Sequence, residues 1–301
     1  MRLHPWMVLF RAGNSFTAGI FGVLLGAILA TRGIPEGDYA LATIFHSISV
    51  MTFMSSWNAL NDLMDIEIDS FNRPERPIPS GEISVKHAKI GIFLMGASSL
   101  FSIFLAGYIS WSGEIGIDSW IPALVIWVVA LALLFHYESP SKFSLKMKDR
   151  GLPGNFAISL SVGLVFIFGA AGVSEPLDPR AWAVFFVGFF YNLSREIVKD
   201  VEDLGGDKGR NTYAISRGPE KARFLAWIVL ILGLISLLFP FVPSIGIFTD
   251  WHVAFVIPAV VTLLLVKPKL FAAEDRAAQK MIKRSMQLCL VAFLVISIIP
   301  F

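Results

Sequence analysis

Long runs of apolar residues alternate with short polar loops along the whole chain. Several runs reach about 20 residues, which is the length a helix needs to cross the hydrocarbon core of a bilayer. A segment inside that core satisfies its backbone hydrogen bonds internally by forming a helix. The pattern therefore predicts an all-α, polytopic membrane protein with nine transmembrane helices. The predicted spans are residues 14–32, 39–61, 87–110, 119–137, 154–173, 180–198, 221–240, 249–267 and 282–301.

Composition supports a membrane protein. Of the 301 residues, 55% are hydrophobic and 16% are charged, whereas about a quarter of the residues of a soluble domain are charged. The single cysteine, Cys289, lies inside the last apolar run, so an internal disulfide is excluded. We interpret Cys289 as a small packing residue rather than a reactive one.

The distribution of basic residues predicts the orientation in the membrane. The N-terminus and the loops after the second, fourth, sixth and eighth runs hold 23 of the 25 lysines and arginines, and the other side holds Arg32 and Arg180. Basic residues mark the cytoplasmic side of a membrane helix. We therefore expect a multi-pass protein of the cell membrane with a cytoplasmic N-terminus and an external C-terminus.

The second apolar run ends in an acidic series on the cytoplasmic side. Asp62, Asp65 and Asp69 are spaced i, i+3, i+7, which places their carboxylates on one face of a helix. Clustered carboxylates repel one another unless a cation lies among them. A solvated, acidic helix end is the simpler interpretation. The loop that follows, residues 72–81, is rich in arginine and proline.

A second acidic series ends the sixth run, and it favours a functional interpretation. Its four carboxylates are spaced i, i+4, i+7, i+11 and belong to Glu196, Asp200, Asp203 and Asp207. Arginines follow both series, namely Arg73, Arg76 and Arg210. Mg²⁺ binds through a few carboxylates together with substrate phosphates, and arginine donates bidentate hydrogen bonds to phosphate oxygens. If the fold joins the two series, they suit a magnesium-bridged diphosphate.

Two further polar segments lie on the cytoplasmic side. The loop 137–150 contains Tyr137, Lys142 and Lys146, and it either contacts anionic lipid or supplies lysines to a diphosphate. Arg11 is placed as an interfacial anchor at the head of the first span. Asn14 lies one turn further into the membrane, where a polar side chain usually faces the interior of the bundle.

These motifs resemble those of the UbiA superfamily of intramembrane prenyltransferases. The run Asn61-Asp62-x-x-Asp65-x-x-x-Asp69, with its arginine/proline tail, matches the first aspartate-rich motif of the superfamily. The second motif is present with Glu196 in place of its first aspartate. The resemblance also covers Arg11-x-x-Asn14 and, at a looser spacing, Tyr137 with Lys142 or Lys146. Because it extends over nearly the whole chain, it implies a single domain, residues 1–301, with nine helices around a cytoplasmic active site.

The resemblance implies Mg²⁺-dependent transfer of a polyprenyl group from its diphosphate to a lipid acceptor, through an allylic carbocation. It implies catalytic roles for Asp62, Asp65, Asp200 and Asp203. The implied metal-binding set is Asn61, Asp62, Asp65, Asp69, Glu196, Asp200, Asp203 and Asp207. The implied diphosphate-binding set is Arg73, Arg76, Lys142, Lys146, Lys199 and Arg210. The implied acceptor-binding set is Arg11, Asn14 and Tyr137.

The residues of both motifs are most similar to those of superfamily members that add a geranylgeranyl chain to geranylgeranylglyceryl phosphate in ether-lipid synthesis. An aromatic prenyltransferase of quinone synthesis is the close alternative, with the same metals. A transporter with intramembrane carboxylates is a more distant one, and the apolar runs lack the midspan Asp or Glu that an ion pathway favours. The expected partners are the two substrates and membrane lipids, without nucleic acid, and the oligomeric state is left open.

Overall fold

The computed structural model describes residues 3–113, 115–139, 141–205 and 211–299. All regular elements in these ranges are helices, as the sequence predicts. The α-helices are α1 Leu3–Leu9, α2 Ala12–Phe16, α3 Val23–Thr31, α4 Gly37–Met64, α5 Ile66–Asn72, α6 Val85–Ser112, α7 Trp120–Glu138, α8 Leu152–Ala171, α9 Pro179–Glu202, α10 Tyr213–Arg217, α11 Pro219–Leu238, α12 Val253–Leu264, α13 Val266–Phe271 and α14 Asp275–Ile298. A π-helical turn, Thr17–Gly22, joins α2 to α3, and four short 3₁₀ helices are Ile117–Ser119, Met147–Arg150, Phe239–Phe241 and Asp250–His252.

Seven helical segments in the described ranges are long and apolar enough to cross a membrane. They are Ala12–Thr31, Val85–Ser112, Ile117–Glu138, Leu152–Ala171, Pro219–Phe241, Asp250–Phe271 and Asp275–Ile298. Two other long helices, α4 and α9, have 28 and 24 residues and are not among the seven. These are the two helices that carry the acidic series.

Each apolar run lies in helical structure, although the first and eighth runs are each divided among several shorter helices, and the largest difference in bounds lies at the last run. There α14 begins at Asp275, whereas the apolar run begins at residue 282. The additional two turns are polar, and the side chains of Ala278 and Ile282 on their inner face are fully buried. A helix continues past the apolar run when one face still packs against the bundle, so hydropathy underestimates its length.

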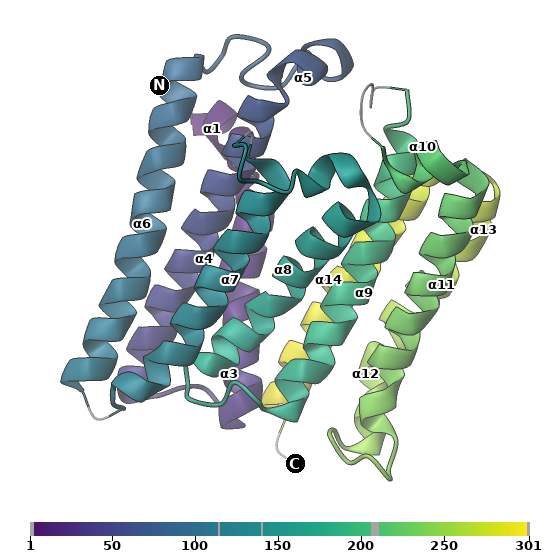
Figure 1. Ribbon diagram of the computed structural model, residues 1–301. Coiled ribbons are helices and arrows are strands. Elements are labelled where there is room, and N and C mark those ends of the chain that lie inside the picture. Colours follow the sequence, from purple (N-terminus) through teal and green to yellow (C-terminus); the bar gives the residue numbers. More distant parts are fainter. Residues whose placement is uncertain (1–2, 114, 140, 206–210, 300–301) are drawn as a thin grey trace.

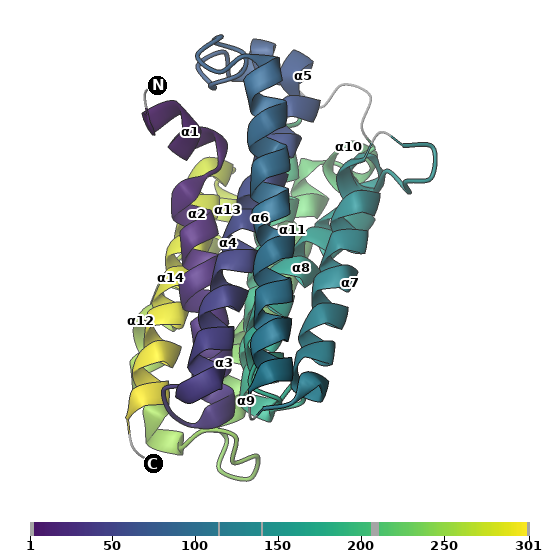
Figure 2. The same cartoon turned by 90° about the vertical axis from the view of Figure 1, so that its left-hand side faces the viewer.

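The long helices run side by side in one bundle (Figure 1). Helix α9 lies at the centre of one half, where it packs against α8, α11 and α14, and α4 packs against α6 in the other half. Figure 2 shows α1, α5 and α10 at the same end of the bundle, near the polar loops. The C-terminal end of α14 lies at the opposite end of the bundle from the N-terminal end of the chain (Figure 1).

Helices α3 and α8 join the two halves along a close backbone contact. A Cβ atom at Gly26 would lie 2.0 Å from the carbonyl oxygen of Phe166, and one at Gly169 would lie 2.1 Å from the carbonyl oxygen of Val23. Contacts under 3 Å to backbone atoms cannot be relieved by a side-chain rotation. The two glycines are therefore required for this helix pair to approach so closely.

Candidate active site

The first acidic series lies where α4 gives way to α5. Asp65 sits between the two helices with φ −90° and ψ 11°, outside the regular helical conformation. Asp62 on α4 and Asp69 on α5 are 3% and 4% exposed, so both carboxylates are buried. Buried carboxylates require hydrogen-bonding partners of opposite charge. Arg11 and Arg76 supply these partners from two other segments of the chain.

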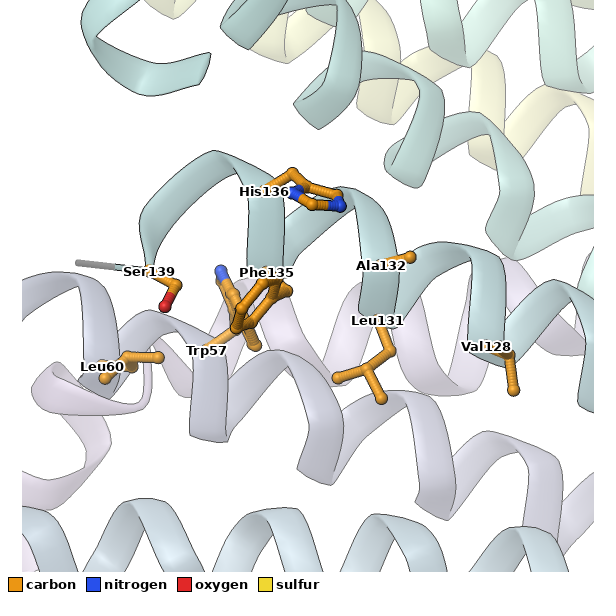
Figure 3. Close-up of a pocket in the computed structure, with 8 residues that line it drawn as sticks. All are labelled: Trp57, Leu60, Val128, Leu131, Ala132, Phe135, His136 and Ser139. Carbon is orange, nitrogen blue, oxygen red and sulfur yellow. The ribbon is translucent and has the colours of Figure 1, made fainter. Parts of the chain in front are cut away.

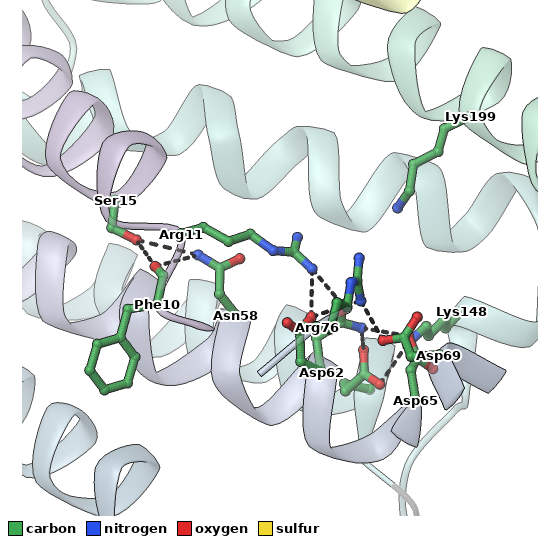
Figure 4. Close-up of polar contacts among 12 residues, drawn as sticks. Phe10, Arg11, Ser15, Asn58, Asp62, Asp65, Asp69, Arg76, Lys148 and Lys199 are labelled. Atoms are coloured by element: carbon green, nitrogen blue, oxygen red, sulfur yellow. Dashed lines mark hydrogen bonds and ion pairs between the residues drawn. The ribbon is translucent and has the colours of Figure 1, made fainter. Parts of the chain in front are cut away.

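Arg76 connects the two buried aspartates of this series. Its Nη1 atom lies 3.1 Å from Asp62 Oδ1 and also forms a short ion pair with Asp69 (Figure 4). Burial raises the pKa of the Asp69 carboxyl, and the charge of Arg76 opposes that rise. The arginine/proline loop therefore folds back over α4 and α5, and its second arginine neutralises the series.

Arg11 reaches the same carboxylates from the N-terminal segment. Its Nη2 atom lies 2.8 Å from Asp62 Oδ1 and donates a 3.3 Å hydrogen bond to Asn61 Oδ1. Arg11 occupies a left-handed conformation, φ 45°, at the break between α1 and α2. The Asn58 amide holds this break, because it donates to the Phe10 carbonyl at 3.4 Å and to Ser15 Oγ at 3.3 Å (Figure 4).

Lys148 and Glu138 complete this half of the site, and the sequence did not identify either residue. Lys148 Nζ donates to both carboxylate oxygens of Asp65, at 2.9 and 2.8 Å, and to Glu138 Oε1 at 2.8 Å. The other oxygen of Glu138 accepts a 2.8 Å hydrogen bond from Asn61 Nδ2. The sequence feature that could have identified them is a carboxylate, Glu138, at the end of an apolar span, followed ten residues later by a lysine, Lys148.

The second acidic series lies along α9. Glu196 is buried and pairs with Arg195 at 2.9 Å and with Lys199 at 3.5 Å. Asp200 Oδ2 accepts a 2.8 Å hydrogen bond from Asn155 Nδ2 on α8. Figure 4 shows the Lys199 amine directed toward the carboxylates of the first series. Acidic and basic side chains therefore lie close together along α9.

A direct ion pair joins the two acidic series. Arg73, in the loop after α5, donates from Nη2 to Asp203 Oδ1 at 3.1 Å. Arg11 also acts electrostatically on the Glu196 carboxylate. The two series therefore belong to one polar cluster at one end of the bundle, through a contact between residues 130 apart in sequence.

The remaining predicted residues lie in other surroundings. Lys142 and Lys146 are exposed and form no ion pair within the described ranges, and the Lys142 amine lies over the ring of Phe143. Lys148, rather than either of these, contacts Asp65. Tyr137 is half-buried on α7, next to Glu138, and Asn14 is exposed on α2. Asp207 and Arg210 lie outside the described residues.

The carboxylate oxygens of the cluster fit Mg²⁺, which takes oxygen ligands. In the described part of the chain, no three acidic, histidine or cysteine side chains converge closely enough to hold a metal by themselves. Mg²⁺ needs only one or two carboxylates when waters and substrate phosphates complete its shell. The aspartates of both series could serve in this way once their basic partners move to the phosphates.

The structure has an apolar groove, whose lining side chains are drawn in Figure 3. It lies between α4 and α7 and has a volume of about 590 Å³. The residues that line it are Trp57, Leu60, Val128, Leu131, Ala132, Phe135, His136 and Ser139. Leu60 and Ser139 are the sequence neighbours of Asn61 and Glu138, so the polar cluster stands at one end of this groove.

Comparison with known proteins identifies relatives over the full length of the chain. Residues 19–291 match the profile of the UbiA prenyltransferase family. The chain is 32% identical over 299 residues to digeranylgeranylglyceryl phosphate synthase of Methanothermobacter thermautotrophicus, covering 97% of this chain and 95% of that protein. It superimposes with a TM-score of 0.69 on a solved structure that concerns digeranylgeranylglyceryl phosphate synthase in membranes. The two chains are 27% identical, and the match covers 98% of each. A UbiA homologue from Archaeoglobus fulgidus, solved with GPP and Mg²⁺, superimposes with a TM-score of 0.63 at 16% identity, over 97% of this chain and 99% of that one.

Proposed function

This chain belongs to the UbiA prenyltransferase family, and we propose that it transfers a geranylgeranyl group from its diphosphate to geranylgeranylglyceryl phosphate in ether-lipid synthesis. The observation that carries the proposal is the joining of two acidic series and their basic partners beside an apolar groove. Relatives named for this product, similar over nearly their whole length, support the choice of acceptor.

The diphosphate binds where basic side chains now neutralise carboxylates. Arg73, Arg76, Lys148 and Lys199 each contact an acidic group of the cluster. When the donor enters, these side chains exchange their carboxylate partners for phosphate oxygens, which accept charge-assisted hydrogen bonds from arginine and lysine. Arg210, which lies outside the described residues, is a further candidate for the same role.

Mg²⁺, when bound, neutralises the leaving diphosphate and thereby favours cleavage of the bond between carbon and oxygen. Asp62, Asp65, Asp69, Asp200 and Asp203 are the aspartates proposed as its ligands within the described ranges. The further candidates expected from the sequence are Asn61, Glu196 and Asp207. A fold neighbour solved with GPP and Mg²⁺ supports the choice of this metal.

The prenyl chain lies in the groove between α4 and α7. Its walls are apolar and include the rings of Trp57 and Phe135. An aromatic, water-poor wall excludes water from an allylic cation and stabilises positive charge through the ring faces. The acceptor hydroxyl oxygen then forms the new carbon–oxygen bond, and its proton passes to the released diphosphate. Arg11, Asn14 and Tyr137 are the proposed acceptor-binding residues.

We also propose nine membrane-spanning helices in one domain, residues 1–301. Helices α4 and α9 are long enough to cross the bilayer in addition to the seven apolar segments. Nine crossings place the two ends of the chain on opposite sides, which agrees with their positions in Figure 1. The excess of basic residues near the carboxylates supports a cytoplasmic site and N-terminus, with the C-terminus external.

A membrane assay with radiolabelled geranylgeranyl diphosphate and Mg²⁺ tests the function. Geranylgeranylglyceryl phosphate and 4-hydroxybenzoate are offered in parallel as acceptors. Label in the glyceryl ether alone is the expected result. Label in the aromatic acid alone would assign the enzyme to quinone synthesis, and the absence of label from both products, with folded protein, would reject both transferase assignments.

A further inference from the structure

A second group of basic side chains lies beside the carboxylate cluster, where α2, α9 and α14 meet. Lys283 on α14 donates a 3.1 Å hydrogen bond to Asn14 Oδ1 on α2. Figure 2 shows α2 and α14 as neighbours along this side of the bundle. Arg195 on α9 is close enough to Lys283 to repel it electrostatically. Three helices thus contribute polar groups to one place.

The charges in this place do not balance. Glu196 pairs with both Arg195 and Lys199, and Arg11 acts on the same carboxylate. Within the described ranges, Lys283 forms no ion pair with a carboxylate, and it donates its hydrogen bond to the neutral amide of Asn14. Arg195 and Lys199 share the single carboxylate of Glu196, and Lys283 adds a further positive charge beside Arg195, which is unfavourable. An anionic ligand would remove that cost.

The donor groups fit a phosphate monoester. The Arg195 guanidinium uses one donor atom on Glu196, and an arginine offers five N–H donors in a planar fork. The Lys283 amine has three donors and bonds Asn14 with one of them. Lys283 is also exposed, so a ligand arriving from the bilayer can reach it without rearrangement of the core.

We infer that Arg195, Lys283 and Asn14 form a subsite for the phosphate of the lipid acceptor, separate from the diphosphate site at the two acidic series. The inference rests on the proposed function, because that function supplies an acceptor with a phosphate next to its reactive hydroxyl. Arg11 contacts Asp62 and also acts on Glu196, so it lies between the two sites. An acceptor held here would present its hydroxyl toward the donor.

The test measures equilibrium binding of geranylgeranylglyceryl phosphate to the protein in phosphatidylcholine nanodiscs without Mg²⁺. The Lys283→Ala variant should bind this lipid about 10-fold more weakly than the wild type, and Lys283→Arg should restore most of the loss. The matched control is Lys280→Ala, which removes a charge one turn earlier on α14 and should bind normally. Geranylgeranylglycerol, which lacks the phosphate, should bind all four proteins equally.

Two results would overturn the inference. The first is equal loss of binding for the lipids with and without phosphate, which would assign Lys283 a structural role. The second is unchanged binding in Lys283→Ala. Phosphatidic acid added to the nanodiscs tests whether the site prefers the acceptor to another lipid with a phosphate. If phosphatidic acid competes equally, Arg195, Lys283 and Asn14 form a general site for phosphate headgroups.

Turnover separates this inference from the proposed function. With Mg²⁺ and geranylgeranyl diphosphate, Lys283→Ala should raise KM for the acceptor about 10-fold and leave KM for the donor unchanged. A rise in the donor KM instead would place Lys283 in the diphosphate site. Tight, Lys283-dependent binding of the acceptor without any transfer would refute the function and leave the phosphate subsite standing.

Discussion

Arg73 Nη2 lies 3.1 Å from Asp203 Oδ1 and joins the loop after α5 to the end of α9. The guanidinium is about one-third exposed, so the pair itself adds little to stability. Its importance is positional, since it spans the gap between the loop after the first acidic series and the second series. In the proposed reaction, this is the gap that the diphosphate and its metal occupy.

Loss of a central aspartate should abolish transfer. Asp65→Ala and Asp200→Ala each remove a candidate metal ligand, and we expect at least about 100-fold lower kcat for either variant. Arg73→Ala should cost only about 10-fold, because Arg76 and Lys148 remain to bind phosphate. Steady-state assays with Mg²⁺ measure these losses, and unchanged thermal unfolding shows that the fold is intact. Normal turnover by Asp65→Ala would contradict the metal assignment.

The lysine that serves the diphosphate is predicted to be Lys148. Lys148→Ala should raise KM for geranylgeranyl diphosphate about 10-fold, because the variant loses a charge-assisted contact. Lys142→Ala removes an exposed lysine of the same loop and is the matched control, with an expected change below about twofold. Donor titrations at saturating acceptor measure both values. Similar donor KM values for the two variants would remove Lys148 from the site.

Chelation of Mg²⁺ should stop turnover without unfolding the protein. The carboxylates in the described ranges already have partners, such as Arg76 for Asp62 and Lys148 for Asp65, so the fold does not depend on a metal to neutralise them. We expect the melting temperature in EDTA to fall by no more than about 3 °C. Differential scanning fluorimetry of the detergent-solubilised protein measures this shift. A collapse of the fold in EDTA would show that the metal is structural.

Filling the apolar groove should discriminate between donors by chain length. Ala132→Trp adds a large ring to the wall of the groove between α4 and α7. We expect KM for geranylgeranyl diphosphate to rise about 10-fold and KM for geranyl diphosphate to change less, since the shorter chain needs less of the groove. Competition between the two donors measures the ratio. The exposed position Ala273, in the turn before α14, provides a control tryptophan substitution.

The helical class and the positions of the acidic series follow from local patterns, and these were predictable. Apolar length predicts each helix, and the i, i+3, i+7 spacing places the aspartates of the first series on one face. The partners of Asp65 were not predictable in the same way. Lys148 reaches Asp65 because Lys146 adopts a left-handed conformation and the next residues form a 3₁₀ turn, so the direction of the loop decides which lysine enters.

The charge balance around Glu196 also could not be predicted from the sequence. Glu196 was placed among the metal ligands because of its position in the second motif. In the structure, its oxygens face Arg195 and Lys199, and a third cation, Arg11, acts on it from the N-terminal segment of the chain. Contacts between distant helices depend on how the bundle packs, and helical periodicity alone does not specify them.

The glycine contact between α3 and α8 has a consequence for how lipids enter. The backbones touch at Gly26 and Gly169, so no acyl or prenyl chain can pass between these two helices. The pair is a fixed contact where α3 crosses α8. A long hydrocarbon substrate must therefore enter through a different gap between helices. The groove between α4 and α7 is already open and offers such an entry.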